Sequence, residues 1–196
     1  MPTDLSPKAA EIAAHARALL AAGGYNGFSY ADIADRVHIS KASIHHHFPS
    51  KARLVEVVVA QYRAEAREGL SALSHQWADP LAALTALVDF WADCLQNGAL
   101  SFCVCAMLAS ELPMVPQEVA AEVRGHFEDL TDWVGGLLQQ AAAQGQLQLR
   151  GDLAVEAGAI VAAIHGAMVS VRAFDRPSLF QQLAQTAIDR LDWRMH

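Results

Sequence analysis

The sequence lacks any run of alternating β-branched and polar residues, the pattern that predicts a half-buried β-strand. Its glycines and prolines recur at intervals that correspond to a helix followed by a turn, and alanine and leucine are abundant between them. The 196 residues, 53% of them hydrophobic, are enough to form a substantial core. These features favour an all-α globular protein.

Cysteine is also scarce, with only Cys94, Cys103 and Cys105 in the chain. An odd number without the spacing of a disulfide framework predicts reduced thiols, and hence a cytoplasmic protein. The N-terminus has no basic segment followed by an apolar core, so we expect no secretory signal. The longest weakly charged stretch, residues 154–171, is interrupted by Glu156 and predicts a buried packing helix rather than a membrane span.

The signatures of common enzymes are absent as well. The sequence contains no Gly-x-Ser-x-Gly nucleophile elbow, no phosphate-binding loop and no His-Glu-x-x-His zinc motif. It also lacks the Glu-x-x-His pairs that a di-iron helical bundle requires. We therefore expect no catalytic residues, no cofactor and no bound metal ion.

Charge is distributed unevenly along the chain. The formal net charge of −7 argues against indiscriminate nucleic-acid binding by the whole surface. The first 51 residues nevertheless carry five basic and four acidic side chains, whereas the remaining 145 carry nine and 17. The first part also holds five of the nine histidines: His15, His38, His45, His46 and His47. This distribution is compatible with a local DNA-binding site on an otherwise acidic protein.

Helix caps, breakers and apolar periodicity divide the chain into nine expected helices. Start signals include Ser6-Pro7 and Asp79-Pro80, and stop signals include Gly23-Gly24 and Asn97-Gly98. No glycine-rich or proline-rich linker follows residue 50, so a rigid connection is expected there. The expected helices cover residues 6–22, 30–37, 41–47, 51–73, 80–96, 101–111, 116–144, 152–173 and 177–191.

The stretch from residue 29 to residue 51 reads as two short helices joined by a tight turn. Ser29 and Ser40 can each cap a helix, and apolar residues follow each cap at helical spacing. Those apolar positions are Ile33, Ala34 and Val37 in the first helix and Ile44 and Phe48 in the second. Helices this short are not stable alone. Their arrangement predicts a helix-turn-helix, which lays its second helix in the major groove of DNA.

The three expected helices at the N-terminus, which end near residue 50, are called the head below. Four short motifs follow one another through the head: Tyr-Asn-Gly-Phe-Ser at 25–29, Asp-Ile-Ala at 32–34, Ile-Ser-Lys-Ala-Ser at 39–43 and Phe-Pro-Ser-Lys at 48–51. In this order they resemble the head of the TetR/AcrR family of one-component transcriptional regulators. The specific resemblance covers residues 12–54. The rest of the chain agrees with the family only in the number and length of its helices.

The resemblance implies a DNA-binding domain over residues 1–50 and a ligand-binding and dimerisation domain over residues 51–196. It implies a homodimer that binds a palindromic double-stranded DNA operator, acts as a repressor and leaves the operator when a small-molecule effector binds. By position it assigns Lys41, Ala42, Ser43, His45 and His46 to the exposed face of the recognition helix, and Ser29, Tyr30, His47 and Lys51 to the phosphate backbone. Lysine neutralises phosphates, hydroxyl groups donate to them, and histidine can reach base edges.

Two positions depart from the family pattern. His45 stands where the family usually has tyrosine, which puts the base preference in question. His38 stands where glycine is frequent, and histidine enters the left-handed region more readily than most residues. The consecutive histidines at 45–47 do not predict a metal site, because neighbouring helical residues point about 100° apart.

In the C-terminal part, aromatic, sulfur-containing and histidine side chains at helical spacing are candidates for lining an effector pocket. Because such pockets are mostly apolar, the expected effector is largely apolar too. Core packing explains the same spacing equally well. The candidates are Phe90, Trp91, Cys94, Phe102, Met107, Met114, Phe127, Trp133, His165 and Met168.

Other interpretations stay open at this level. A thiol-based sensor of oxidants or electrophiles could use Cys94, Cys103 or Cys105, although no lysine or arginine lies near them in sequence to lower a thiol pKa. A helical protein-interaction module without DNA binding would leave the polar recognition helix unexplained. Helices 152–173 and 177–191 carry small and apolar faces that suit either the core or a second copy of the chain. The family resemblance favours the second copy and a four-helix interface.

Overall fold

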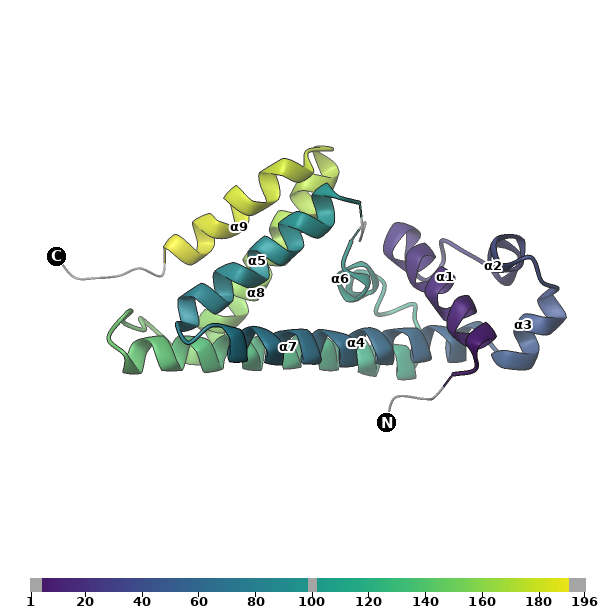
Figure 1. The fold of residues 1–196 in the computed structure, drawn as a ribbon, viewed down its shortest axis with the longest axis horizontal. Helices are drawn as coiled ribbons and strands as arrows, with labels where there is room; N and C mark the ends of the chain where they lie inside the picture. The colour runs from purple at the N-terminus through teal and green to yellow at the C-terminus, as the bar shows by residue number, and fades with distance from the viewer. Residues whose placement is uncertain (1–4, 99–101, 191–196) are drawn as a thin grey trace. The chain divides into compact units, whose positions relative to one another are not determined.

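The computed structural model describes residues 5–98 and 102–190. Within these ranges the chain forms nine α-helices and one short 3-10 turn, without any β-strand (Figure 1). The predicted all-α class is therefore confirmed. The elements are α1 (Pro7–Gly23), α2 (Tyr30–Val37), α3 (Lys41–His47), α4 (Lys51–Gln76), α5 (Pro80–Gln96), α6 (Val104–Ala109), α7 (Gln117–Ala143), α8 (Leu153–Ala173), η1 (Pro177–Leu179) and α9 (Phe180–Asp189).

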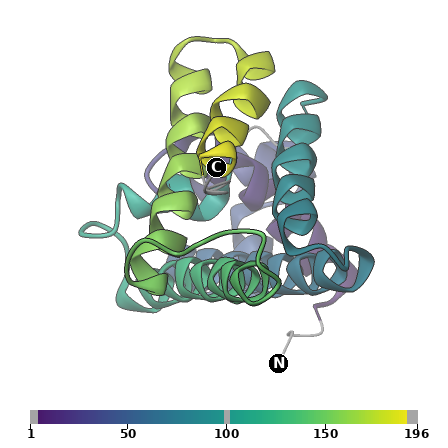
Figure 2. The same cartoon turned by 90° about the vertical axis from the view of Figure 1, so that its left-hand side faces the viewer.

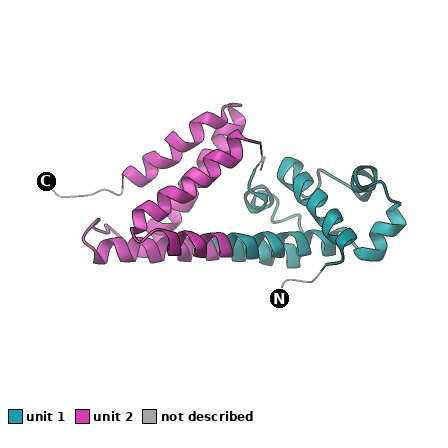
Figure 3. Cartoon of the chain, in the orientation of Figure 1, with its two compact units in different colours: residues 1–66, 100–127 teal, residues 67–99, 128–196 magenta. Residues whose placement is uncertain are grey.

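The contacts of the chain group into two compact units (Figure 3). Unit 1 comprises Met1–Ala66 and Leu100–Phe127, and unit 2 comprises Arg67–Ala99 and Glu128–His196. Helices α4 and α7 each contribute residues to both units. The division into domains at residue 50 stays a prediction from the family resemblance.

Helix α1 begins and ends where the sequence signals indicate. Ser6 caps it by accepting a hydrogen bond from the Ala9 N–H at 3.3 Å. Gly24 ends it with a φ of 74°, a left-handed conformation that favours glycine. The buried face of α1 includes Ile12 and Leu20, and burying each side chain contributes about 1.5–3 kcal/mol. This face packs against α2 and α6 within unit 1.

Helices α2 and α3 form the predicted helix-turn-helix. The Asp32 carboxylate accepts hydrogen bonds from both the N–H and the hydroxyl of Ser29, at 2.7 Å each, which completes a capping box at the start of α2. His38 ends α2 in the left-handed region, with φ 55° and ψ 45°, as the sequence allowed. Ser40 then caps α3 by accepting from the Ser43 N–H at 3.1 Å.

Unit 2 contains α5, α8, η1 and α9, together with the last part of α4 and most of α7. Helix α9 lies against both α8 and α5, and the end-on view shows α8 and α9 side by side and joined by a turn (Figure 2). The buried side chains of this unit include Leu84 of α5, Met168 of α8 and Phe180 of α9. By length and composition alone α8 could also cross a membrane, but one such helix is weak evidence, and one side of α8 packs against α9 in this structure.

Three predicted helices differ from those in the structure, and one of them, α4, continues to Gln76, three residues beyond its predicted end. The last one begins as the 3-10 turn η1 before α9 starts at Phe180, and Arg176 before it makes no side-chain cap, unlike the residues that precede the prolines at the start of α1 and α5. The end predicted for this helix, Leu191, lies outside the described residues. The helix predicted over residues 101–111 is the shorter α6, capped by Cys103, and Ser101 also lies outside the described residues.

Candidate functional site

The recognition helix α3 has one buried face and one exposed polar face. Ile44 is fully buried and Phe48, which follows the helix, is 3% exposed. These two side chains therefore anchor α3 to the rest of the head. The five residues predicted for its DNA-facing surface are all exposed: Lys41, Ala42, Ser43, His45 and His46.

The side chain of His45 is held in a defined orientation. Its ring packs edge-on against Tyr30, with 4.7 Å between the centroids. Its Nδ1 lies 3.3 Å from the Pro49 carbonyl oxygen. Because a carbonyl can only accept, Nδ1 carries the proton in this contact, and Nε2 of the neutral ring is then an acceptor. An acceptor in the major groove matches the amino groups of adenine and cytosine.

Tyr30, predicted to contact the phosphate backbone, is an internal group of the head. Its ring is 9% exposed, and its hydroxyl donates to the Phe48 carbonyl at 2.9 Å. Burial raises the pKa of Tyr30 to about 12. The hydrogen bond joins α2 to the end of α3. In this structure Tyr30 therefore fixes the angle between the two helices.

Lys51, also predicted to contact phosphate, is half-buried and turned inward. Its ammonium donates to the Phe28 carbonyl and lies 4.2 Å from the centroid of the Phe28 ring and 4.8 Å from that of Tyr25. Burial lowers the pKa of Lys51, while the charges of Glu111 and Asp32 act in the opposite direction. The Lys51 side chain thus fastens the start of α4 to the loop before α2. Its phosphate contact, like those of Ser29, Tyr30 and His47, stays a prediction.

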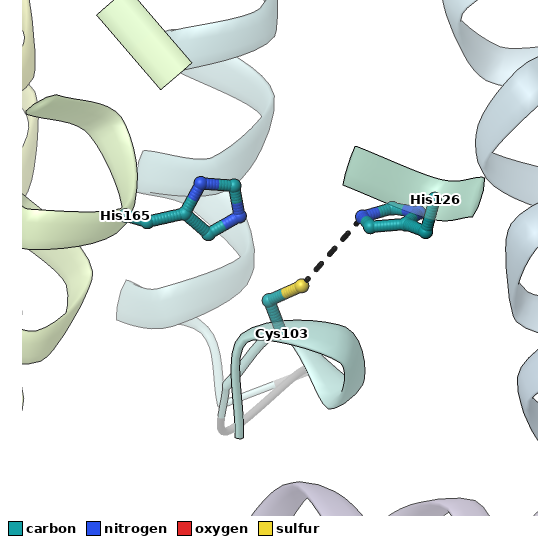
Figure 4. Close-up of side chains that lie close together, drawn as sticks. All are labelled: Cys103, His126 and His165. Carbon is teal, nitrogen blue, oxygen red and sulfur yellow. Dashed lines mark hydrogen bonds between the residues drawn. The ribbon is translucent and has the colours of Figure 1, made fainter. Parts of the chain in front are cut away.

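A buried polar cluster lies in the part of unit 1 formed by α4, α6 and α7. The Tyr62 hydroxyl donates to Cys103 Sγ at 3.2 Å, and Cys103 Sγ lies 4.0 Å from His126 Nε2 (Figure 4). The Arg17 guanidinium lies over the Tyr62 ring, 4.9 Å from its centroid. Cys103 and His126 are 1% and 6% exposed, so this cluster is sheltered from bulk water. Sequence reasoning missed Tyr62 and His126 because nothing local marks them as neighbours of Cys103.

The pKa of each of the three thiols is raised in this environment. Burial raises the pKa of Cys103, although the Tyr62 hydroxyl and nearby backbone amides act to lower it. Burial also raises the pKa of Cys105 well above its ordinary value, and that of Cys94 to a smaller extent. A raised pKa reduces the thiolate fraction at neutral pH. These surroundings argue against a thiol-based sensor.

The ten residues predicted to line an effector pocket have diverse environments. Phe102 and Met168 are buried, whereas Phe90 is 51% exposed and Met114 is 73% exposed. Four of the ten belong to unit 1, namely Phe102, Met107, Met114 and Phe127, and six belong to unit 2, namely Phe90, Trp91, Cys94, Trp133, His165 and Met168. The predicted pocket accordingly stays a prediction.

Two of the candidates in unit 2 have polar partners. Trp133 donates from Nε1 to the Ser74 hydroxyl at 2.8 Å. His165 Nδ1 lies 2.8 Å from the Val161 carbonyl oxygen, one turn earlier in α8. Burial lowers the pKa of His165, and the carbonyl contact acts against it. Both side chains therefore satisfy hydrogen bonds within their own unit.

Glu111 was missed by sequence reasoning. It lies in the turn after α6, yet its Oε2 accepts a hydrogen bond from the Tyr25 N–H, 86 residues earlier, at 2.6 Å. Neither a motif nor a spacing connects these two positions. Only the fold brings this carboxylate to the loop that precedes α2.

Comparisons with known proteins agree with this arrangement. The family model described as bacterial regulatory proteins, tetR family, matches residues 12–58, and that of the tetracyclin repressor-like C-terminal domain matches residues 80–187. Among solved structures, a TetR-family transcriptional regulator from Agrobacterium tumefaciens is 45% identical in sequence. The match covers 94% of this chain and 97% of that one, with a TM-score of 0.92. No match was found among curated proteins.

More distant structures share the fold. A TetR regulator from Legionella pneumophila is 23% identical, with a TM-score of 0.84 over 96% of this chain and all of that one. The structure of AibR in complex with isovaleryl coenzyme A and operator DNA is 20% identical, with a TM-score of 0.73 and coverage of 96% and 100%. At these identities the likeness concerns the arrangement of helices alone.

Proposed function

Since the chain belongs to the TetR family of bacterial transcriptional regulators, we propose that it represses transcription by binding a palindromic operator as a homodimer and is released by a small-molecule effector. Members of this family are non-enzymatic DNA-binding transcription factors. The interpretation as a protein-interaction module without DNA binding is thereby set aside. The proposed compartment is the cytoplasm, where the operator is accessible.

The observation that carries the proposal is the surface of α3. Its outward side chains are an ammonium, a methyl group, a hydroxyl and two imidazoles, while its inward side chain, Ile44, is fully buried. A polar helix face presented in this way can contact both phosphates and base edges. The near-neutral head also avoids the repulsion that the net charge of −7 would cause elsewhere on the surface.

Dimerisation is supported by the exposed side of unit 2. One series of exposed positions on α8 recurs alternately every four and three residues and carries no charge, although the exposed Arg172 lies near its C-terminal end: Val155, Ala159, Ala162, Gly166, Val169 and Ala173. Val155 is 69% exposed and Val169 is 56% exposed, and Leu183 on the neighbouring α9 is 43% exposed. Small side chains allow two helices to approach closely, so this face suits the same face of a second copy.

An operator-binding experiment tests the proposal. A random-sequence duplex pool is selected with the wild-type protein, and the enriched duplex is titrated at several salt concentrations. Enrichment of a two-fold symmetric sequence is expected. The salt slope is the slope of the logarithm of the binding constant against the logarithm of the salt concentration. If Lys41 neutralises one phosphate per subunit, the Lys41→Ala variant loses about one unit of this slope per half-site.

The matched control is Arg124→Ala, which removes the same charge from an exposed position on α7. We expect its salt slope to equal that of the wild type. If no duplex is enriched, the proposed function is wrong. If Lys41→Ala and Arg124→Ala bind alike, the placement of α3 in the groove is wrong.

A further inference from the structure

The loop between α1 and α2 is held by a residue from a distant part of the sequence. Glu111 lies immediately after Ser110, the residue that ends α6, and its N–H bonds to the Leu108 carbonyl at 3.0 Å. This anchored turn directs the Glu111 carboxylate at the Tyr25 N–H, with 2.6 Å between Oε2 and N. A hydrogen bond to a carboxylate is roughly twice as strong as one between neutral groups.

The backbone at Gly24 is shaped around this carboxylate. Gly24 has a φ of 74°, and a Cβ placed there would lie 2.5 Å from Glu111 Oε2. A Cβ and a carboxylate oxygen do not come this close in proteins, so the Glu111 carboxylate would have to move away. The absence of a side chain at Gly24 is therefore what lets the carboxylate reach the Tyr25 amide. Two independent features of the sequence, a glycine at 24 and an acid at 111, serve one contact.

The same loop is held by a second charged group, which comes from the first residue of α4. The Lys51 ammonium binds the Phe28 carbonyl and lies over the rings of Tyr25 and Phe28. The Glu111 charge acts to raise the pKa of Lys51, against the larger effect of burial, which lowers it. The loop from Gly24 to Phe28 is thus fixed by one carboxylate and one ammonium from outside it.

This loop leads directly into the residues that orient the DNA-binding helices. Ser29, the next residue, is the N-cap of α2, and α2 carries Tyr30, which bonds to the end of α3. A change in the loop therefore reaches α3 through a short chain of hydrogen bonds. Helix α6 also packs against α1, so the carboxylate and the start of the head belong to one compact unit.

We propose that Glu111 is a positioning residue for operator binding, although it lies far outside the helix-turn-helix in sequence. It acts through the Gly24–Phe28 loop, whose conformation it fixes, and so holds α2 and α3 ready for the DNA. The inference rests on the proposed function, because it concerns the affinity for an operator. A residue that merely stabilises the fold would change the unfolding free energy and leave the affinity of the folded protein unchanged.

The test uses the full chain and the duplex that the wild-type protein enriches from a random pool. Three variants are compared with the wild type: Glu111→Ala, Glu111→Gln and Glu118→Ala. Glutamine keeps an oxygen that can accept from the Tyr25 N–H but carries no charge. Glu118 is an exposed acid in the first turn of α7 and controls for the loss of one negative charge.

Each variant is measured for operator affinity at a temperature at which it is fully folded, and for hydrogen exchange of the Tyr25 amide. For Glu111→Ala we expect faster exchange at Tyr25 and operator binding weaker by about three- to ten-fold, the range of one lost charged hydrogen bond that acts indirectly. Glu111→Gln should lie between Glu111→Ala and the wild type. Glu118→Ala should bind like the wild type.

The outcomes separate the two levels of inference. If the wild type enriches no duplex, the proposed function fails. If the wild type binds and Glu111→Ala binds equally well despite faster exchange at Tyr25, the positioning role of Glu111 is wrong. Unchanged exchange at Tyr25 would overturn it too, because the contact itself would then be missing. Should Glu111→Ala fail to fold, the comparison of Glu111→Gln with Glu118→Ala decides the question.

Discussion

Single residues of the head combine a backbone role with a side-chain contact. Gly24 is a clear case, because its left-handed backbone and its missing side chain are both used. Gly23, the last residue of α1, has no atom within 4 Å of the position its Cβ would take. The two neighbouring glycines therefore face opposite constraints, which makes them a matched pair for experiment.

We predict that Gly24→Ala lowers the free energy of unfolding by about 1–3 kcal/mol, because a residue with a Cβ is strained at this φ and collides with the Glu111 carboxylate. Gly23→Ala should be neutral or stabilising by up to about 1 kcal/mol, since alanine favours the helix. Urea denaturation of both variants measures the difference. Equal stabilities for the two would contradict the assigned geometry of Gly24.

Short elements of this protein depend on their caps. Helix α2 has only eight residues and cannot persist by propensity alone. Its capping box supplies hydrogen-bond partners for backbone groups at the start of the helix. There the Asp32 carboxylate accepts hydrogen bonds from the N–H and from the hydroxyl of Ser29. The hydrogen bonds from the Ser29 side chain and backbone lower the pKa of Asp32. The cap of α2 should therefore respond to acid.

We predict that the capping contribution of Asp32 disappears at low pH. A lowered pKa in the folded state means that the contribution is present above the unfolded value, about 3.9, and is lost as the pH falls through the folded value. Wild type and Asp32→Asn should therefore differ in unfolding free energy at pH 7 and converge toward pH 3. Asp35→Asn, an exposed change of the same charge in the same helix, is the control. A gap that stays constant between pH 7 and pH 3 would exclude the capping role.

At the scale of the whole molecule, the exposed side of α8 is the feature that most needs explanation. Val155 and Val169 lie on an uncharged face and are more than half exposed in the single chain. Phe174, just past the end of α8, is 61% exposed. Several exposed apolar side chains along one helix are typical of an interaction surface. The proposed homodimer would bury it.

We predict that Val169→Glu converts the proposed dimer to a monomer, because it places a charge among the uncharged exposed positions of α8, about one turn from its C-terminal end. Sedimentation equilibrium at micromolar concentration measures the change. Loss of the second half-site should weaken operator binding on the order of 100-fold or more. Ala121→Glu, at an exposed position on α7, adds the same charge elsewhere and should remain dimeric. Dimeric Val169→Glu would place the interface on another surface.

Local patterns determined much of this protein. The caps at Ser6, Ser29 and Ser40 are all present in the structure, and the helix predicted over residues 41–47 has those bounds. The family was also recognisable from four motifs in the head, and the comparisons confirm it. Such signals are readable because helix caps and helical faces involve residues only three or four positions apart.

The tertiary structure alone decided which charged and polar side chains serve the interior. Lys51 reads as a phosphate contact in the motif, yet its ammonium is engaged by the loop before α2. Glu111 reads as an ordinary surface acid, yet it bonds to an amide 86 residues away. Tyr62 and His126 come to Cys103 from separate helices. These contacts depend on how helices pack, and packing brings together positions whose sequence separation carries no periodic signal.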